Sequence, residues 1–172
     1  MVIKLLKKIN KSPEDVAILS PINELICKVA CLDGGYYLYN KTGDQIAQII
    51  FEGNTAYLSV SSPVPVFPAS IKMVYEGGCF AFLPMEVAAS DREIIANIKN
   101  KKDLELFSLR GDPAGYSYDV YLGNKVYSNV VPSSTDKKYY LMRLAKDANL
   151  LKALLISLAI DYYAGEAVPN AK

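Results

Sequence analysis

The sequence contains no histidine, the side chain that most often serves as a general base or a metal ligand in proteins. This absence excludes serine triads and histidine-ligated zinc sites. Arginine is scarce as well, because only Arg92, Arg110 and Arg143 occur, scattered along the chain. Catalysis would have to rely on carboxylate, lysine and tyrosine side chains.

Cysteine is also rare, with 3 residues, Cys27, Cys31 and Cys79. An odd number cannot pair completely, and the spacing lacks the Cys-x-x-Cys motif of zinc and redox sites. If Cys27 and Cys31 share a strand, they point the same way but lie about 13 Å apart, too far for a disulfide. We interpret the cysteines as reduced core residues, which favours a cytoplasmic protein.

No segment has the pattern of a signal peptide or a membrane span. The opening residues, MVIKLLKKIN, mix lysines into the apolar positions and lack a cleavage site of small residues. The apolar run at 150–160 contains Lys152 and Ser157 and is about half of the ~20 residues that a bilayer crossing requires. The sequence therefore predicts neither secretion nor a transmembrane segment.

Length and charge indicate one globular domain over residues 1–172. Of the 172 residues, 51% are hydrophobic and 22% are charged, and the formal net charge is +1. A chain so close to neutral has no strong long-range attraction for nucleic acid or membrane. No nucleic-acid partner is expected, and any anion site must be local.

Short β-branched and aromatic runs dominate the chain from Glu24 to Val131, broken at close intervals by turn-forming residues. This pattern is typical of antiparallel strands joined by tight turns, here expected at 33–35, 43–44, 53–54, 77–78 and 123–124. The predicted strands are Leu25–Leu32, Tyr36–Tyr39, Gln45–Phe51, Ala56–Ser61, Ile71–Tyr75, Cys79–Leu83, Leu104–Leu109, Ser117–Tyr121, Lys125–Val130 and Tyr139–Leu144.

Prolines and mixed patterns characterise three other stretches. Pro63, Pro65 and Pro68 remove backbone donors, so their segment runs along an edge or a loop. Residues 110–113, Arg-Gly-Asp-Pro, are interpreted as a turn whose backbone the proline fixes. Residues 85–102 fit either a short helix or a strand, and the sequence alone leaves both open.

Two hairpins about half a chain apart share one pattern. Residues 36–39 lead through Gly43 to 45–46, and residues 118–121 lead through Gly123 to 125–126. Each combines an aromatic and aliphatic strand, a polar turn with glycine, and a second aliphatic strand. The pattern predicts a sheet of two pseudo-repeated halves, although unrelated hairpins also share these features.

The C-terminal segment predicts a helix that protein encloses on most sides. Asn149 is a good N-cap, and apolar residues then fall on every helical face from 150 to 160. The stop is expected at Gly165, after Asp161-Tyr162-Tyr163. A membrane anchor is the less favoured alternative, because the polar face is too small and the segment too short.

These hairpins, of the form YYLYNKTGDQIAQI, and the terminal segment KDANLLKALLISLAIDYY resemble the tubby C-terminal-like superfamily over about Leu25 to Tyr163. Its LURP-one-related branch, related to the phospholipid scramblases, is the most similar. The resemblance implies an α+β, mainly β fold: a closed antiparallel barrel of about twelve strands around a hydrophobic C-terminal helix. Asp147 and Asp161 match acidic residues that the family carries before and near the end of its helix.

The resemblance also implies a binding or scaffold domain and not an enzyme, because the helix fills the barrel. Tubby proteins bind phosphoinositide headgroups through a Lys-x-Arg pair, which this sequence lacks, so that site is not transferred. The calcium-linked, membrane-proximal segment of the scramblases has no counterpart here. No catalytic residue, cofactor or metal is expected.

Basic residues cluster in three places, and most such clusters simply solvate a surface. A surface that pools two of them would bind phosphate or an anionic lipid. The clusters lie at Lys4, Lys7, Lys8 and Lys11, at Lys99, Lys101 and Lys102, and at Lys137, Lys138, Arg143 and Lys146. Our candidate anion-binding residues are Lys99, Lys101, Lys102, Lys137, Lys138 and Arg143.

The leading hypothesis is a non-enzymatic domain that binds an anionic phospholipid headgroup or a protein partner. A small hydrolase-type enzyme remains an alternative, with carboxylates such as Asp103 and Glu105, or Glu86, Asp91 and Glu93, as its acid–base or metal-binding groups. A purely structural, self-assembling domain is the third alternative, favoured by the prolines and the many tyrosines.

Overall fold

The computed structural model describes residues 1–11, 15–32, 34–60, 70–76, 79–84 and 107–167. Strands account for most of this part of the chain, and one long helix follows them. The elements are β1 (Val2–Leu6), η1 (Ile9–Lys11), β2 (Val16–Leu19), β3 (Leu25–Leu32), β4 (Gly35–Tyr39), β5 (Gln45–Glu52), β6 (Thr55–Val60), β7 (Ser70–Glu76), β8 (Cys79–Pro84), β9 (Phe107–Asp112), β10 (Ser117–Leu122), β11 (Lys125–Pro132), β12 (Tyr139–Leu144) and α2 (Leu150–Ala167).

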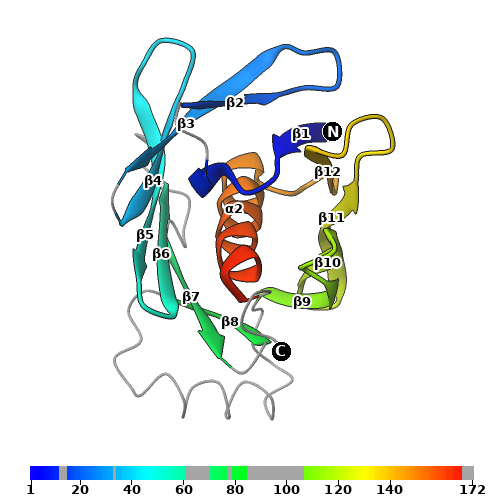
Figure 1. Ribbon diagram of the computed structural model, residues 1–172. Coiled ribbons are helices and arrows are strands. Elements are labelled where there is room, and N and C mark those ends of the chain that lie inside the picture. Colours follow the sequence, from blue (N-terminus) through cyan, green and yellow to red (C-terminus); the bar gives the residue numbers. More distant parts are fainter. Residues whose placement is uncertain (12–14, 33, 61–69, 77–78, 85–106, 168–172) are drawn as a thin grey trace.

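The strands form a 12-stranded antiparallel sheet in the order β8-β7-β6-β5-β4-β3-β2-β1-β12-β11-β10-β9. The sheet curls into a nearly closed barrel, with β8 and β9 at its two edges (Figure 1). The rings of Phe82 and Phe107 meet edge-to-face across this seam, with centroids 6.1 Å apart. The predicted barrel is confirmed, except that no ladder joins β8 to β9 within the described residues.

Helix α2 runs through the middle of the barrel, as its uniformly apolar sequence predicts (Figure 1). Leu154 and Leu158 are fully buried among the inward-facing side chains of the strands. The Asn149 side chain caps the helix by accepting a 3.0 Å hydrogen bond from the backbone N–H of Lys152. The expected stop at Gly165 is wrong, because the helix continues to Ala167 and a glycine weakens a helix without necessarily ending it.

The two similar hairpins share an irregularity as well as a sequence pattern. The register shifts between Leu38 and Tyr39 in the β4–β5 pair, and between Val120 and Tyr121 in the β10–β11 pair. Both shifts lie at the same place in the shared pattern, so the two hairpins bend at equivalent residues. This agreement supports the prediction of two pseudo-repeated halves.

Several local predictions need correction. β1 and β2 lie outside the predicted strands, because both are short, with 5 and 4 residues. The turn expected at 110–113 is also wrong, since residues up to Asp112 belong to β9 and the turn occupies 113–116. Cys27 is buried and Cys31 half-buried, but Cys79 is exposed and is no core residue. The features expected at 63–68 and 85–102 fall outside the described residues.

Gly111 is expected to tolerate alanine poorly. Its φ is +121°, and a Cβ atom would lie 2.6 Å from the backbone oxygen of Ser117. Gly43 is the matched control, because its φ is +88° but an added Cβ meets nothing within 4 Å. Gly43→Ala should cost about 1 kcal/mol of unfolding free energy from backbone strain, and Gly111→Ala about 3 kcal/mol. Urea denaturation measures both, and equal losses would contradict the predicted steric contribution.

Candidate functional site

Pairing of β1 with β12 brings basic side chains from distant parts of the sequence onto one outer surface. Lys4 lies opposite Leu141 and Val2 lies opposite Arg143, so Lys4 and Arg143 are close neighbours on the outward side of the sheet. The ammonium group of Lys4 lies 4.3 Å from the ring centroid of Tyr139 on the same side. Apolar side chains such as Ile3 alternate with them and point into the core.

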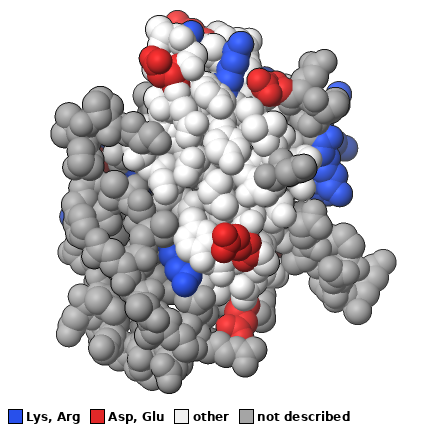
Figure 2. All heavy atoms as spheres, turned by 90° about the vertical axis from the view of Figure 1, so that its left-hand side faces the viewer, with Lys and Arg blue, Asp and Glu red and all other residues white. Residues whose placement is uncertain are grey.

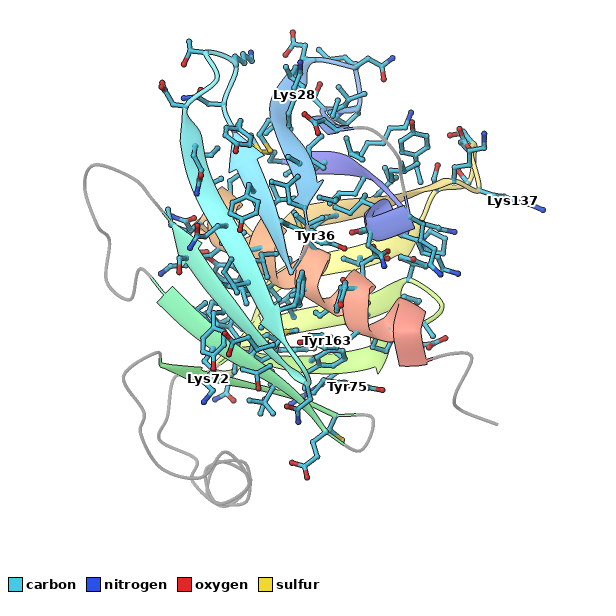
Figure 3. The ribbon with its side chains drawn as sticks, turned by 60° about the vertical axis from the view of Figure 1, so that its left-hand side comes forward. Lys28, Tyr36, Lys72, Tyr75, Lys137 and Tyr163 are labelled. Carbon is cyan, nitrogen blue, oxygen red and sulfur yellow. The ribbon has the colours of Figure 1, made fainter. Side chains whose placement is uncertain are left out.

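The basic surface continues beyond the ends of these strands. The backbone N–H of Lys7 donates a 2.9 Å hydrogen bond to the carbonyl oxygen of Lys138, which joins the segment after β1 to the loop before β12. Lys137 lies in that loop and its side chain projects away from the barrel (Figure 3). We call this surface the basic face; it consists of Lys4, Lys7, Lys8, Lys137, Lys138 and Arg143.

Acidic groups offset the charge of the basic face only in part. Asp136 lies in the same loop, and its carboxylate accepts a 3.0 Å hydrogen bond from the backbone N–H of Lys138. Lys8, Lys137, Lys138 and Arg143 are exposed, so their ammonium and guanidinium groups are accessible to a ligand. A chain with a net charge of only +1 therefore carries a local concentration of positive charge.

The candidate anion-binding residues are thus only partly brought together. Lys137, Lys138 and Arg143 lie on the basic face, whereas Lys99, Lys101 and Lys102 fall outside the described residues. The other members of the basic face are Lys4, Lys7 and Lys8 from the N-terminal segment. Their place beside β12 follows from the long-range pairing of β1 with β12. The acidic residues that we considered for a hydrolase or metal site also fall outside the described residues.

A second cluster, directly behind the basic face, centres on the carboxylate of Asp161 in helix α2. Asp161 is 3% exposed. Its carboxylate accepts hydrogen bonds of 3.0 and 3.3 Å from the backbone N–H of Lys8 and one of 2.5 Å from the hydroxyl of Tyr116. The cluster therefore joins the segment after β1, the loop between β9 and β10, and the helix inside the barrel.

Both donors to Asp161 have an unusual backbone conformation. Lys8 has φ of 53° and Tyr116 has φ of 55°, in the left-handed region that side chains with a Cβ atom disfavour. Such a conformation costs about 1–2 kcal/mol per residue, so the surrounding contacts must stabilise it. Hydrogen bonds to a charged acceptor are among the stronger ones, and both residues direct theirs to the same carboxylate.

Burial raises the pKa of Asp161 above its ordinary value, because water no longer solvates the charged form. Hydrogen bonds from Tyr116 and from the backbone of Lys8 and Ile9 lower the pKa again, but only in part. Burial and the neighbouring Asp161 charge raise the pKa of Tyr116, which keeps its hydroxyl protonated and able to donate. Burial likewise raises the pKa of Cys31 to about 11, so this nearby thiol is unreactive.

Tyr140 lies next to this cluster but contributes no hydrogen bond to it. Its ring packs on that of Tyr116, with centroids 4.9 Å apart, and its side chain is fully buried. The Tyr140 hydroxyl has no hydrogen-bond partner among the described residues. Tyr116 and Tyr140 thus form a natural pair for comparison, since only the first uses its hydroxyl to hold Asp161.

An aromatic cluster holds the C-terminal part of helix α2, directly after Asp161. Tyr163 stacks on Tyr75 with centroids 5.7 Å apart, and its hydroxyl donates a 3.2 Å hydrogen bond to the carbonyl oxygen of Gly53 (Figure 3). Tyr162 stacks on Phe51 at 3.9 Å. These contacts attach the helix to β5, β7 and the turn after β5, and they explain part of the unusual tyrosine content.

The outer face of β3 to β6 differs from the basic face, because few charged side chains lie on it (Figure 2). Its outward positions include the partly exposed side chains of Tyr37, Ile50 and Tyr57. Within the described part of the chain, no helix is long and apolar enough to cross a membrane. The same residues contain no group of three acidic or cysteine side chains arranged to hold a metal ion.

Comparison with known proteins supports the fold. No protein-family model and no curated protein matches the sequence. The chain is similar to the X-ray structure of the protein AT5G01750 from Arabidopsis thaliana, with a TM-score of 0.58 and 12% sequence identity. The alignment covers 96% of this chain and 91% of the plant protein. At this identity the similarity concerns the fold alone.

Proposed function

We propose that the chain is a non-enzymatic binding domain whose basic face docks on anionic phospholipid headgroups at a membrane surface. The observation that carries the proposal is the pairing of β1 with β12, which unites Lys4, Lys7 and Lys8 with Lys137, Lys138 and Arg143. A small cluster of basic residues near an anionic leaflet contributes about 1 kcal/mol per Lys or Arg.

The arrangement of the barrel favours binding over catalysis. Helix α2 occupies the interior, where some other barrels hold a small ligand. The buried carboxylate of Asp161 already has its donors within the chain, so its role in this proposal is structural. The surface that remains for recognition is the outside of the barrel.

We also propose that the chain belongs to the tubby C-terminal-like superfamily, in its LURP-one-related branch, and acts in the cytoplasm. The helix within the barrel, the repeated hairpins and Asp161 near the helix end support this membership. The unpaired cysteines are consistent with a reducing compartment. The proposed lipid site differs from the Lys-x-Arg pair of tubby proteins, because its residues come from two distant segments.

Replacing Lys137 and Lys138 by glutamine is expected to weaken binding to vesicles of phosphatidylcholine with phosphatidylserine. The loss should be about 2 kcal/mol, roughly thirtyfold in affinity, because two cations leave the basic face. Sedimentation with vesicles measures it, and added salt should weaken the binding of the wild-type chain.

The matched control replaces Lys28 and Lys41 by glutamine; these lysines are also exposed but lie on β3 and in the turn after β4. This double variant has the same change in charge and should bind like the wild-type chain. If both double variants lost the same affinity for the vesicles, net charge alone would explain the binding, and a defined basic face would be contradicted. No preference of the wild-type chain for phosphatidylserine would overturn the lipid proposal.

In that case a protein partner becomes the better proposal, and the outer face of β3 to β6, which carries few charged side chains, is the surface to study (Figure 2). Partly exposed tyrosine and isoleucine side chains, such as Tyr57 and Ile50, are common in protein–protein contacts. Such a protein partner could be a second copy of this chain.

A further inference from the structure

The lysines that follow β1 have few contacts that determine their position. Lys7 is held by its backbone hydrogen bond to Lys138 and by its ammonium group, which lies 4.9 Å from the ring centroid of Tyr116. Lys8 is held by the hydrogen bonds of its backbone N–H to Asp161. Tyr116 in turn donates its hydroxyl hydrogen bond to Asp161, so contacts of both lysines depend on one carboxylate.

The conformation of Lys8 depends strongly on this carboxylate. A residue in the left-handed conformation can turn successive backbone N–H groups toward a single anion. Lys8 has this conformation, and the backbone of both Lys8 and Ile9 interacts with the Asp161 carboxylate. Without the negative charge the hydrogen bonds to this acceptor are weaker, so less of the cost of the left-handed conformation is offset. The segment then relaxes, and the side chains of Lys7 and Lys8 change direction.

We propose that Asp161, although buried inside the barrel, is a positioning residue that holds Lys7 and Lys8 on the basic face and thereby strengthens binding to anionic membranes. This inference rests on the proposed function. It connects helix α2, which touches no ligand, to the recognition surface through two hydrogen-bonded contacts, at Lys8 and at Tyr116.

The test compares the binding of Asp161→Asn and wild-type chains to phosphatidylcholine vesicles with phosphatidylserine, at a temperature where both are folded. The variant should bind about tenfold more weakly, with a weaker salt dependence, because fewer cations contact the membrane. Tyr116→Phe, which keeps the charge of Asp161 but removes one donor, should show a smaller loss. Tyr140→Phe removes the neighbouring unpartnered hydroxyl and should bind like the wild-type chain.

A cycle of variants separates positioning from general destabilisation. In a chain that already carries Lys7→Gln and Lys8→Gln, Asp161→Asn should cause no further loss of binding. In a chain with Lys137→Gln and Lys138→Gln it should still cause most of its loss. An equal loss in both backgrounds, or no loss in the wild-type background, would overturn the positioning role.

A measurement without lipid distinguishes failure of this inference from failure of the proposed function. Hydrogen exchange of the Lys8 and Ile9 amides should be slow in the wild-type chain and in Tyr140→Phe, and at least tenfold faster in Asp161→Asn. If the wild-type chain ignores anionic vesicles, the lipid function falls while slow Lys8 exchange still supports the role of Asp161. If the Lys8 amide exchanges equally fast in all variants, the positioning role is overturned whatever the vesicles show.

Discussion

Replacing Leu158 by aspartate is expected to unfold the chain. Leu158 is fully buried in the middle of helix α2, where the barrel surrounds it. The change removes about 2 kcal/mol of hydrophobic stabilisation and places an unpaired carboxylate in the core, which costs several kcal/mol more. The sum approaches the whole stability of a typical domain, about 5–15 kcal/mol. Circular dichroism and urea denaturation should show no cooperative unfolding transition.

Leu151→Asp is the matched control, since it introduces the same side chain in the first turn of the same helix. Leu151 is only half-buried, and a negative charge near the start of a helix interacts favourably with its dipole. This variant should stay folded and lose less than about 2 kcal/mol. A cooperatively folded Leu158→Asp chain would contradict the enclosure of α2 by the barrel.

Replacing Asp161 by alanine should produce the second large loss, roughly 3 kcal/mol of unfolding free energy. The change removes the acceptor of the partly buried backbone N–H of Lys8 and of the buried hydroxyl of Tyr116, and an unsatisfied buried group costs about 1–3 kcal/mol. Asp147→Ala is the control, because Asp147 is exposed just before the helix and should change stability by less than about 0.5 kcal/mol. Similar losses at both positions would contradict a special role for Asp161.

The pH dependence of the same position has a definite sign. Because burial raises the pKa of Asp161 in the folded chain, the folded state binds this proton more tightly than the unfolded state does. The stability that this proton contributes is fully present below the pKa of Asp161 in the unfolded chain, about 3.9. It is lost as the pH rises through the higher pKa of Asp161 in the folded chain. Relative to Asp161→Asn, the wild-type chain should therefore lose stability over this interval, and an opposite slope would contradict the raised pKa.

Much of the fold is readable from local sequence. The turns with Gly34, Gly43, Gly53 and Gly123 adopt the expected positive φ, because glycine alone makes that conformation inexpensive. The predicted strand Tyr139–Leu144 agrees with β12. The apolar helix was predictable because its residues offer no polar face to solvent.

β1 and β2 were missed although part of the signal was present. Ile3 and Leu5 alternate with Lys4, and this period of two is typical of a strand with one face in the core. A strand of five residues is a short pattern, and one of its two neighbours in the sheet, β12, comes from distant sequence.

The candidate site was harder to predict than the fold because it depends on register. The basic residues at 137–143 form a cluster in the sequence itself, but their combination with Lys4, Lys7 and Lys8 requires the pairing of β1 with β12. Asp161 stands out in the sequence as an acid at the end of an apolar run. Its donors, Lys8 and Tyr116, could not be identified, because neither hydrogen bond follows from any local pattern.

The order of elements along the chain also governs how the barrel is completed. β1 precedes every other strand yet pairs with β12, and α2 follows all the strands yet fills their centre. Within the described residues, the inner faces of the strands pack on the buried side chains of α2, which is made after them. During synthesis, the inner faces of β1 to β12 therefore stay partly exposed until residues 150–167 have left the ribosome. Closure of the barrel then requires contacts between segments that are far apart in the sequence.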